Sequence, residues 1–290
     1  MRVGGWHGWA QTIADTFKLV LKEDIIHGQA DKKLFILAPF IVFMGSFAIF
    51  AAIPFSKNIM ASGVNIGIFY ILAISSVVVI GIIMAGWASN NKWSLYGAMR
   101  SAAQIVSYEI PVALSILSVI MLVGTLEMRE ISLAQQGGFW KWFIFRNPFT
   151  FLAFFVYFIS ATAEVNRMPF DIPEAESELV AGFHTEYSGL RWSIFFLSEY
   201  ANILAVSAIA TTLFLGGWES PLGGVGLPGF GIIWFLLKAI FLVFVIMWFR
   251  WTFPRLSVDQ LMYACWKVMI PLAFLNIVGV GIWMKLTGQI

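Results

Sequence analysis

The sequence is poor in the residues on which most metal and redox centres depend. It has one cysteine and three histidines in 290 residues. The single cysteine, Cys265, excludes a disulfide within the chain, a zinc site made of several cysteines and a cysteine-ligated iron–sulfur cluster. The histidines, His7, His27 and His184, lie far apart and share no metal-ligand spacing. We therefore expect no cofactor and no metal bound by this chain.

Charge is also scarce. Charged residues make up 12% of the chain, against 60% hydrophobic and 17% aromatic residues. A soluble domain has about twice that share of charge, and it cannot hide so much apolar surface in its interior. The net charge of +2 gives no indication of a nucleic-acid partner. The composition predicts an all-α, polytopic membrane helix bundle.

Seven uncharged stretches are candidates for crossing the membrane, which needs about 20 apolar residues in a helix. We read them as one integral membrane domain, 1–290. Two of the stretches, 112–126 and 149–163, are short, so they should recruit neighbours such as Glu109 and Glu164 on the cytoplasmic side. The stretches are 34–55, 66–88, 112–126, 149–163, 194–215, 230–249 and 268–284.

Lysine and arginine set the expected orientation. Twelve of them fall on the side of the N-terminus, which would also hold the loop 89–111, and five fall on the other side. Because basic residues stay preferentially in the cytoplasm, the N-terminal side and the acidic loop 164–193 should face the cytoplasm.

Residues 10–26 have the pattern of an amphipathic helix that is too charged to span. Ile13, Phe17 and Val20 recur at helical spacing on one face, and Asp15 and Lys18 lie on another. We expect this helix to lie in the membrane interface. A passive surface anchor and attraction of lipid headgroups by the lysines both fit the same pattern.

Acidic residues concentrate between positions 164 and 199. Apolar residues, including Phe170 and Phe183, alternate with them, which predicts that part of the loop is buried. Ionisable groups at membrane depth are costly and are functional candidates for that reason. Clustered carboxylates suit a proton path, a cation path or a docking surface, and the residues alone do not choose among these. The acids are Glu164, Asp171, Glu174, Glu176, Glu178, Glu186 and Glu199, the last about one turn inside the next span.

Five stretches of the chain resemble one family in collinear order. The most specific is EVNRMPFDIPEAESELVAGF at 164–183, and the others are 13–26, 89–111, 185–189 and 197–202. They resemble the H subunits of NADH-quinone oxidoreductase, the proton-pumping respiratory complex I. The resemblance implies a bundle of eight membrane helices against which the peripheral redox arm docks.

The resemblance also implies roles for particular residues. With the peripheral arm, members of this family form a chamber where ubiquinone or menaquinone is reduced, while NAD, FMN and iron–sulfur clusters belong to partner subunits. Carried over, the chamber-lining candidates are Asp15, Phe17, Lys18, Arg167, Phe170, Asp171 and Phe183. Candidates for a proton path toward the pumping subunits are Arg100, Glu109, Glu164, Glu174, Glu176, Glu178 and Glu199. The implied partners are the peripheral-arm and membrane-arm subunits, quinone and lipid.

The start of the chain departs from the family pattern. Members have a first membrane helix and an arginine-rich loop before the position that corresponds to Arg2, so we expect seven spans here rather than eight. In-frame upstream DNA is expected to encode that helix.

Three other functions compete with this interpretation. The homologous subunit of a membrane-bound hydrogenase, a formate hydrogenlyase or another donor:quinone dehydrogenase would share the fold and parts of the acidic loop. A stand-alone cation/proton antiporter would explain buried carboxylates and Lys238. However, it predicts inverted repeats, which the sequence does not show, and acids in mid-span, whereas we expect the acids of this chain near one surface. A purely structural anchor predicts that neutralising the glutamates leaves turnover intact.

Overall fold

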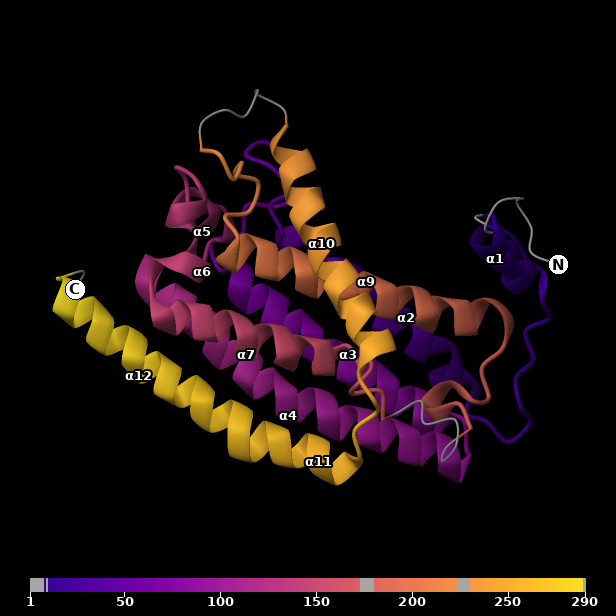
Figure 1. Ribbon diagram of the computed structural model, residues 1–290. Coiled ribbons are helices and arrows are strands. Elements are labelled where there is room, and N and C mark those ends of the chain that lie inside the picture. Colours follow the sequence, from indigo (N-terminus) through magenta and orange to yellow (C-terminus); the bar gives the residue numbers. More distant parts are fainter. Residues whose placement is uncertain (1–7, 9, 173–179, 224–229, 289–290) are drawn as a thin grey trace.

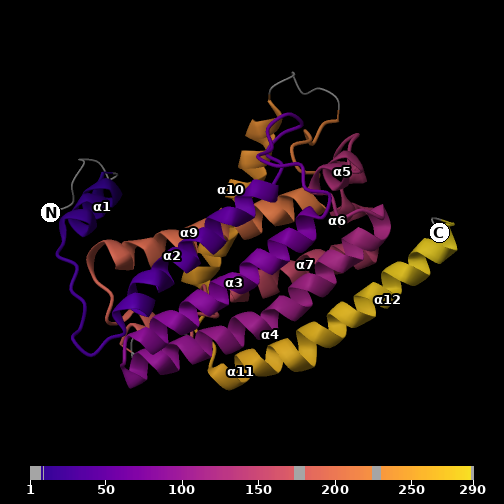
Figure 2. The ribbon, with the colours of Figure 1, turned by 180° about the vertical axis from the view of Figure 1, so that it is seen from behind.

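The computed structural model describes residue 8 and residues 10–172, 180–223 and 230–288. Every regular element in these ranges is helical, and none is a strand. Figures 1 and 2 show a bundle of long helices, with α1 set apart at one end and α12 running along one edge beside α4. The elements are α1 (Gln11–Leu21), α2 (Lys32–Ala48), η2 (Ile49–Ala52), α3 (Gly67–Ala88), α4 (Lys92–Val123), α5 (Met128–Leu133), η3 (Phe139–Lys141), α6 (Phe143–Arg146), α7 (Pro148–Glu164), η4 (Gly182–His184), α9 (Gly189–Phe214), α10 (Gly231–Thr252), α11 (Val258–Tyr263), η5 (Ala264–Met269) and α12 (Ile270–Thr287).

Six helical segments are long and apolar enough to cross a membrane. They are 32–52, 67–88, 92–123, 189–214, 231–252 and 258–287. The seventh expected span, α7, is a shorter apolar helix of 17 residues. The all-α membrane fold expected from composition is therefore confirmed for the described residues.

Three spans, 92–123, 189–214 and 258–287, begin at least five residues earlier than the uncharged stretches suggest. Residues 89–111 were expected to form a cytoplasmic loop, but α4 begins at Lys92 and is 32 residues long. Glu109 therefore lies in the middle of α4 and not at the end of a short helix, and the expectation was wrong. Likewise, Glu199 lies about three turns inside α9 rather than one. Helices continue through charged residues because backbone hydrogen bonds and packing maintain them.

Polar side chains define where the helices begin. The Asp31 side chain accepts hydrogen bonds from the first amides of α2, and Asn91 caps α4 in the same way. Asn147 caps α7, and Ser257 forms a reciprocal capping box with Gln260 at the start of α11. These residues satisfy amides that have no partner within the helix itself.

Small residues allow the helices of the bundle to pack closely. A Cβ added to Gly81 of α3 would lie 2.5 Å from the Val42 side chain of α2. A Cβ on Gly97 of α4 would lie 2.8 Å from the backbone of Gly182 in η4. Small residues permit such close approach of membrane helices. The second contact seats the turn that carries Phe183 against α4.

The amphipathic helix forms, but it is shorter than expected and ends at Leu21. None of its residues is buried, and the Phe17 side chain is 64% exposed. The segment after it is tied to the start of α9, where Arg191 Nε lies 3.0 Å from Asp24 Oδ2 and the Ser188 hydroxyl accepts from the Ile25 amide. Its apolar face thus stays uncovered by the described part of the chain, as an interfacial helix requires.

Candidate functional site

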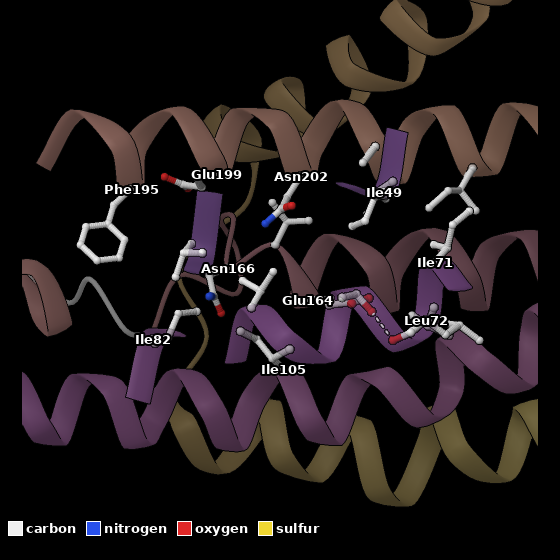
Figure 3. Close-up of a pocket in the computed structure, with 18 of the residues that line it drawn as sticks. Ile49, Ile71, Leu72, Ile82, Ile105, Glu164, Asn166, Phe195, Glu199 and Asn202 are labelled. Carbon is white, nitrogen blue, oxygen red and sulfur yellow. Dashed lines mark hydrogen bonds between the residues drawn. The ribbon is translucent and has the colours of Figure 1, made fainter. Parts of the chain in front are cut away.

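A buried cavity lies among α2, α3, α4, α7, η4 and α9. Its walls are mainly aliphatic and aromatic, with a few polar side chains. Figure 3 shows Glu199 and Asn202 projecting from α9, with Asn166 and Glu164 nearby from the end of α7 and the segment after it. The cavity volume is about 100 Å³. Because one water molecule needs about 10–15 Å³ of such volume, the cavity accommodates several waters.

The volume also limits what else can enter. Pockets for drug-sized ligands have roughly 300–1,000 Å³, so a quinone ring with its tail does not fit this cavity. The Oδ1 atoms of Asn166 and Asn202 are buried and accept no hydrogen bond from the described residues. Buried acceptors of this kind are commonly satisfied by internal water. The cavity is thus suited to water and protons.

Arg167 and Glu199 form a buried ion pair at one side of this cavity. Arg167 Nε lies 3.0 Å from Glu199 Oε1, and the two side chains are 6% and 17% exposed. The guanidinium also lies over the Tyr200 ring, 4.7 Å from its centroid. A charge is tolerated at this depth because its partner and the ring face compensate for lost water.

Glu164 and Glu109 form a second carboxylate group, further into the bundle. Glu164 lines the cavity at the end of α7, and it interacts electrostatically with Glu109 of α4. The Ser76 hydroxyl of α3 donates a hydrogen bond to Glu109 Oε1. Three helices therefore bring two acids and a hydroxyl together, although the residues lie far apart in the sequence.

Asp171 is held by an arginine that the sequence pattern did not indicate. Arg255 Nε donates to the Asp171 backbone carbonyl at 2.6 Å, and Arg255 Nη2 lies 3.6 Å from Asp171 Oδ2. The Leu256 amide donates to the Pro169 carbonyl at 3.1 Å. The connection between α10 and α11 thus fixes the first part of the acidic loop.

Gln104 of α4 fixes the same segment from the other side. Its Nε2 donates to the carbonyls of Ala163 and Phe170 at 2.8 and 2.7 Å. Phe170 is buried and packs against Tyr108, with ring centroids 5.9 Å apart. Neither Gln104 nor Arg255 was expected from the sequence, since neither lies in the acidic loop. A polar residue on the inner face of an apolar helix was the available signal for Gln104.

Phe183 and His184 close the cavity at η4. The Phe183 ring lines it and packs edge-on against Phe195, and the Ser94 hydroxyl donates to the Phe183 carbonyl. Burial lowers the pKa of His184 to about 4, and the nearby Asp171 opposes this only partly. His184 is therefore neutral at pH 7; it lines the cavity and lies near Asp171.

Asp15, Phe17, Lys18 and Arg100 do not line this cavity. Asp15, Phe17 and Lys18 lie on the exposed helix α1, where Asp15 accepts a hydrogen bond from Gln11. Arg100 lies on α4, partly exposed, more than two turns before Glu109. Glu174, Glu176 and Glu178 lie outside the described residues. Within the described ranges, no three His, Cys, Asp or Glu side chains are grouped to hold a metal ion.

Comparison with known proteins gives a consistent result. Residues 1–281 match the NADH dehydrogenase family. The chain is 52% identical to the NADH-quinone oxidoreductase H subunit of Chlorobium luteolum, over 98% of this chain and 79% of that protein. It is also 52% identical to the H subunit of a Geobacillus species, over 95% and 80%, and 50% identical to that of Bacteroides fragilis, over 96% and 78%.

The chain belongs to the family of NADH-quinone oxidoreductase H subunits. As a member of that family it is a multi-pass membrane subunit of complex I, and its partners include the other subunits of the complex. The expected resemblance is confirmed over nearly the whole chain. The chain is shorter than these relatives.

Proposed function

We propose that this protein forms part of the wall of a quinone chamber and couples quinone reduction to proton translocation through its buried carboxylates. The observation that carries the proposal is the shared cavity. Glu164 and Glu199 come from different helices and line one cavity, with Arg167 paired to Glu199. Quinone, ubiquinone or menaquinone, would bind on the side of Asp171, Phe170 and the peripheral arm, because the cavity itself is too small for it.

The arrangement suits stepwise transfer of charge. Quinone reduction creates negative charge that attracts protons, and neighbouring carboxylates respond by changing their protonation. His184 lies between the Asp171 segment and the cavity, Glu199 and Glu164 line the cavity, and Glu109 with Ser76 follows. The electrostatic contacts that support this path are those of Asp171 with His184 and of Glu109 with Glu164. NAD, FMN and iron–sulfur clusters would be held by partner subunits, and lipid would cover the apolar outer face.

Topology follows from the same proposal. We place α7 as a seventh span, since 17 helical residues extend about 26 Å and interfacial neighbours supply the remainder. The excess of lysine and arginine then puts the acidic loop at the cytoplasmic face of a prokaryotic inner membrane. The docking side for the peripheral arm is the side of this loop.

Proton pumping in vesicles reconstituted with the assembled complex tests the coupling. Glu109→Gln, Glu164→Gln and Glu199→Gln each keep the shape of the side chain and remove its charge. Each change is expected to lower proton pumping or shift the pH optimum of quinone-linked turnover. One double variant should lose less than the sum of its two single variants, because members of one unit are not additive.

Two controls make the result interpretable. Glu130→Gln changes an exposed glutamate on α5, remote in the chain from these carboxylates, and should leave pumping unchanged. NADH oxidation by an artificial acceptor reports intact assembly. Pumping at the wild-type level in all three single variants would show that these glutamates have no part in coupling, and strictly additive losses would show that they act at separate places.

A further inference from the structure

Two helices of the bundle are irregular where they meet. Helix α4 contains Pro111 in its interior. The last span contains a π-helical segment, η5, between α11 and α12, where the Ile270 amide bonds to the Cys265 carbonyl five residues earlier. Such π segments are rare, and they often mark functional positions. The two irregular segments are in contact through side-chain hydrogen bonds.

Proline explains the first of these bonds. In a regular helix the amide of residue 111 would bond to the Ser107 carbonyl, but proline has no N–H. The Cys265 thiol donates to that carbonyl instead, with Sγ 3.1 Å from the oxygen. Cys265 is fully buried. The π segment thus supplies a donor to the acceptor that Pro111 leaves without one.

A second bond runs in the opposite direction. The Tyr108 hydroxyl of α4 donates to the Leu261 carbonyl of α11 at 3.0 Å, and Tyr108 is fully buried as well. Ser107 and Tyr108 therefore attach one face of this α4 turn to the last span. Leu261 and Cys265 pack with Phe170 and Ala163 in the same apolar cluster.

The carboxylate of Glu109 lies on the same turn. Successive residues of a helix are about 100° apart, so Glu109 points away from the face that Ser107 and Tyr108 use. It meets Ser76 of α3 and the carboxylate of Glu164. Among the described residues, the titratable groups around this turn include Glu164, Tyr108 and Cys265, and Tyr157 of α7 lies near Glu164. The α4 turn that lacks a backbone hydrogen bond at Pro111 is thus attached to the last span on one face and carries the Glu109 carboxylate on another face.

We propose that the π segment clamps the proline-broken turn of α4 and so positions Glu109. Cys265 and Tyr108 are positioning residues, and they hold Glu109 in its place beside Ser76 and Glu164. This inference rests on the proposed role of Glu109 in coupling. The clamp also connects two parts of the site, because α11 begins directly after Arg255 and Leu256, which hold the Asp171 segment.

A double-mutant cycle between Cys265 and Pro111 tests the clamp. Cys265→Ala removes the donor, and Cys265→Ser retains one. Pro111→Ala restores the backbone amide, so that the Ser107 carbonyl no longer depends on the thiol. An ordinary hydrogen bond changes an equilibrium by about two- to tenfold. We expect Cys265→Ala to lower the number of protons pumped per quinone reduced, because the fraction of turnovers that pump protons falls by about two- to tenfold. The pH dependence of pumping should shift as well.

The expected pattern has three parts. Cys265→Ser stays near wild type, Cys265→Ala is impaired, and the effect of Cys265→Ala is smaller in the Pro111→Ala background than in wild type. Tyr108→Phe should resemble Cys265→Ala, since it keeps the ring and loses the hydroxyl. NADH oxidation by an artificial acceptor serves as the measure of assembly.

Several outcomes would overturn the clamp. They are wild-type pumping in Cys265→Ala, equal impairment in Cys265→Ser and Cys265→Ala, and an equal effect of Cys265→Ala in both backgrounds. Glu109→Gln separates the two hypotheses. Impaired Glu109→Gln with normal Cys265→Ala refutes the clamp alone, whereas normal pumping in both refutes the proposed role of Glu109 as well.

Discussion

The buried pair of Arg167 and Glu199 offers the sharpest test of the site. Replacing Arg167 by alanine removes the cation 3.0 Å from the Glu199 carboxylate and its contact with the Tyr200 ring. The change removes the Arg167 charge from a carboxylate that is only 17% exposed. We expect a severe loss of quinone reductase activity, with assembly and artificial-acceptor activity retained.

The magnitude follows from the burial of both side chains. Breaking a fully buried pair typically costs about 3–5 kcal/mol, because the remaining charge is uncompensated. Because the Glu199 side chain is 17% exposed, solvent reduces this cost, so we expect about 2–3 kcal/mol at the site. If this cost of about 2–3 kcal/mol is added to the activation free energy of turnover, the rate falls by roughly 30- to 150-fold.

The assay compares five variants of the assembled complex by NADH:quinone turnover, among them the single change Glu199→Gln. Arg167→Ala should be the most impaired, and Arg167→Lys should retain part of the activity through its charge. The double variant Arg167→Ala with Glu199→Gln should lose less than the two single changes together, because no unpaired charge remains. Arg146→Ala, an exposed arginine that also contacts a ring, serves as the matched control. Normal quinone turnover in Arg167→Ala, or an additive double variant, would refute the reasoning.

Three further predictions follow from the described geometry. A tag inserted at 174–178 should be labelled only from the cytoplasm and one near Trp218 only from outside, and the reverse pattern would disprove the orientation. Because the pKa of His184 is about 4 when folded and about 6.5 when unfolded, the unfolded chain binds more protons between these values. The contribution of His184 to the free energy of unfolding should therefore be fully present above pH 6.5, and it should decrease by up to about 3 kcal/mol as the pH falls to 4. His184→Gln should abolish the corresponding decrease in melting temperature. Arg255→Ala should release the Asp171 segment and raise the KM for quinone several-fold, with partial rescue by lysine; an unchanged KM would mean that Arg255 does not position this segment.

The sequence determined the class of protein and the general arrangement. Low charge and long apolar stretches leave no alternative to a membrane helix bundle, because so much apolar surface is stable only in lipid. All seven stretches lie largely in helices, and the motif at 164–183 was sufficient to indicate the family. Helix ends were harder to predict. Lys92 and Arg100 lie before the uncharged stretch at 112–126 but inside the helix, since charge in a sequence does not break backbone hydrogen bonds.

The pairing of charged residues depended on tertiary structure. Arg167 lies among the acids of the loop in the sequence, but it pairs with Glu199 on α9, and Asp171 is held by Arg255. Local periodicity gives the face of each helix but not its rotation and height against its neighbours, which arise from packing such as that of Gly97 on Gly182. The shared cavity and the contact between Pro111's turn and the π segment are products of that packing. The sequence thus identified the candidate residues, and the packing of the helices determined which of them lie in contact.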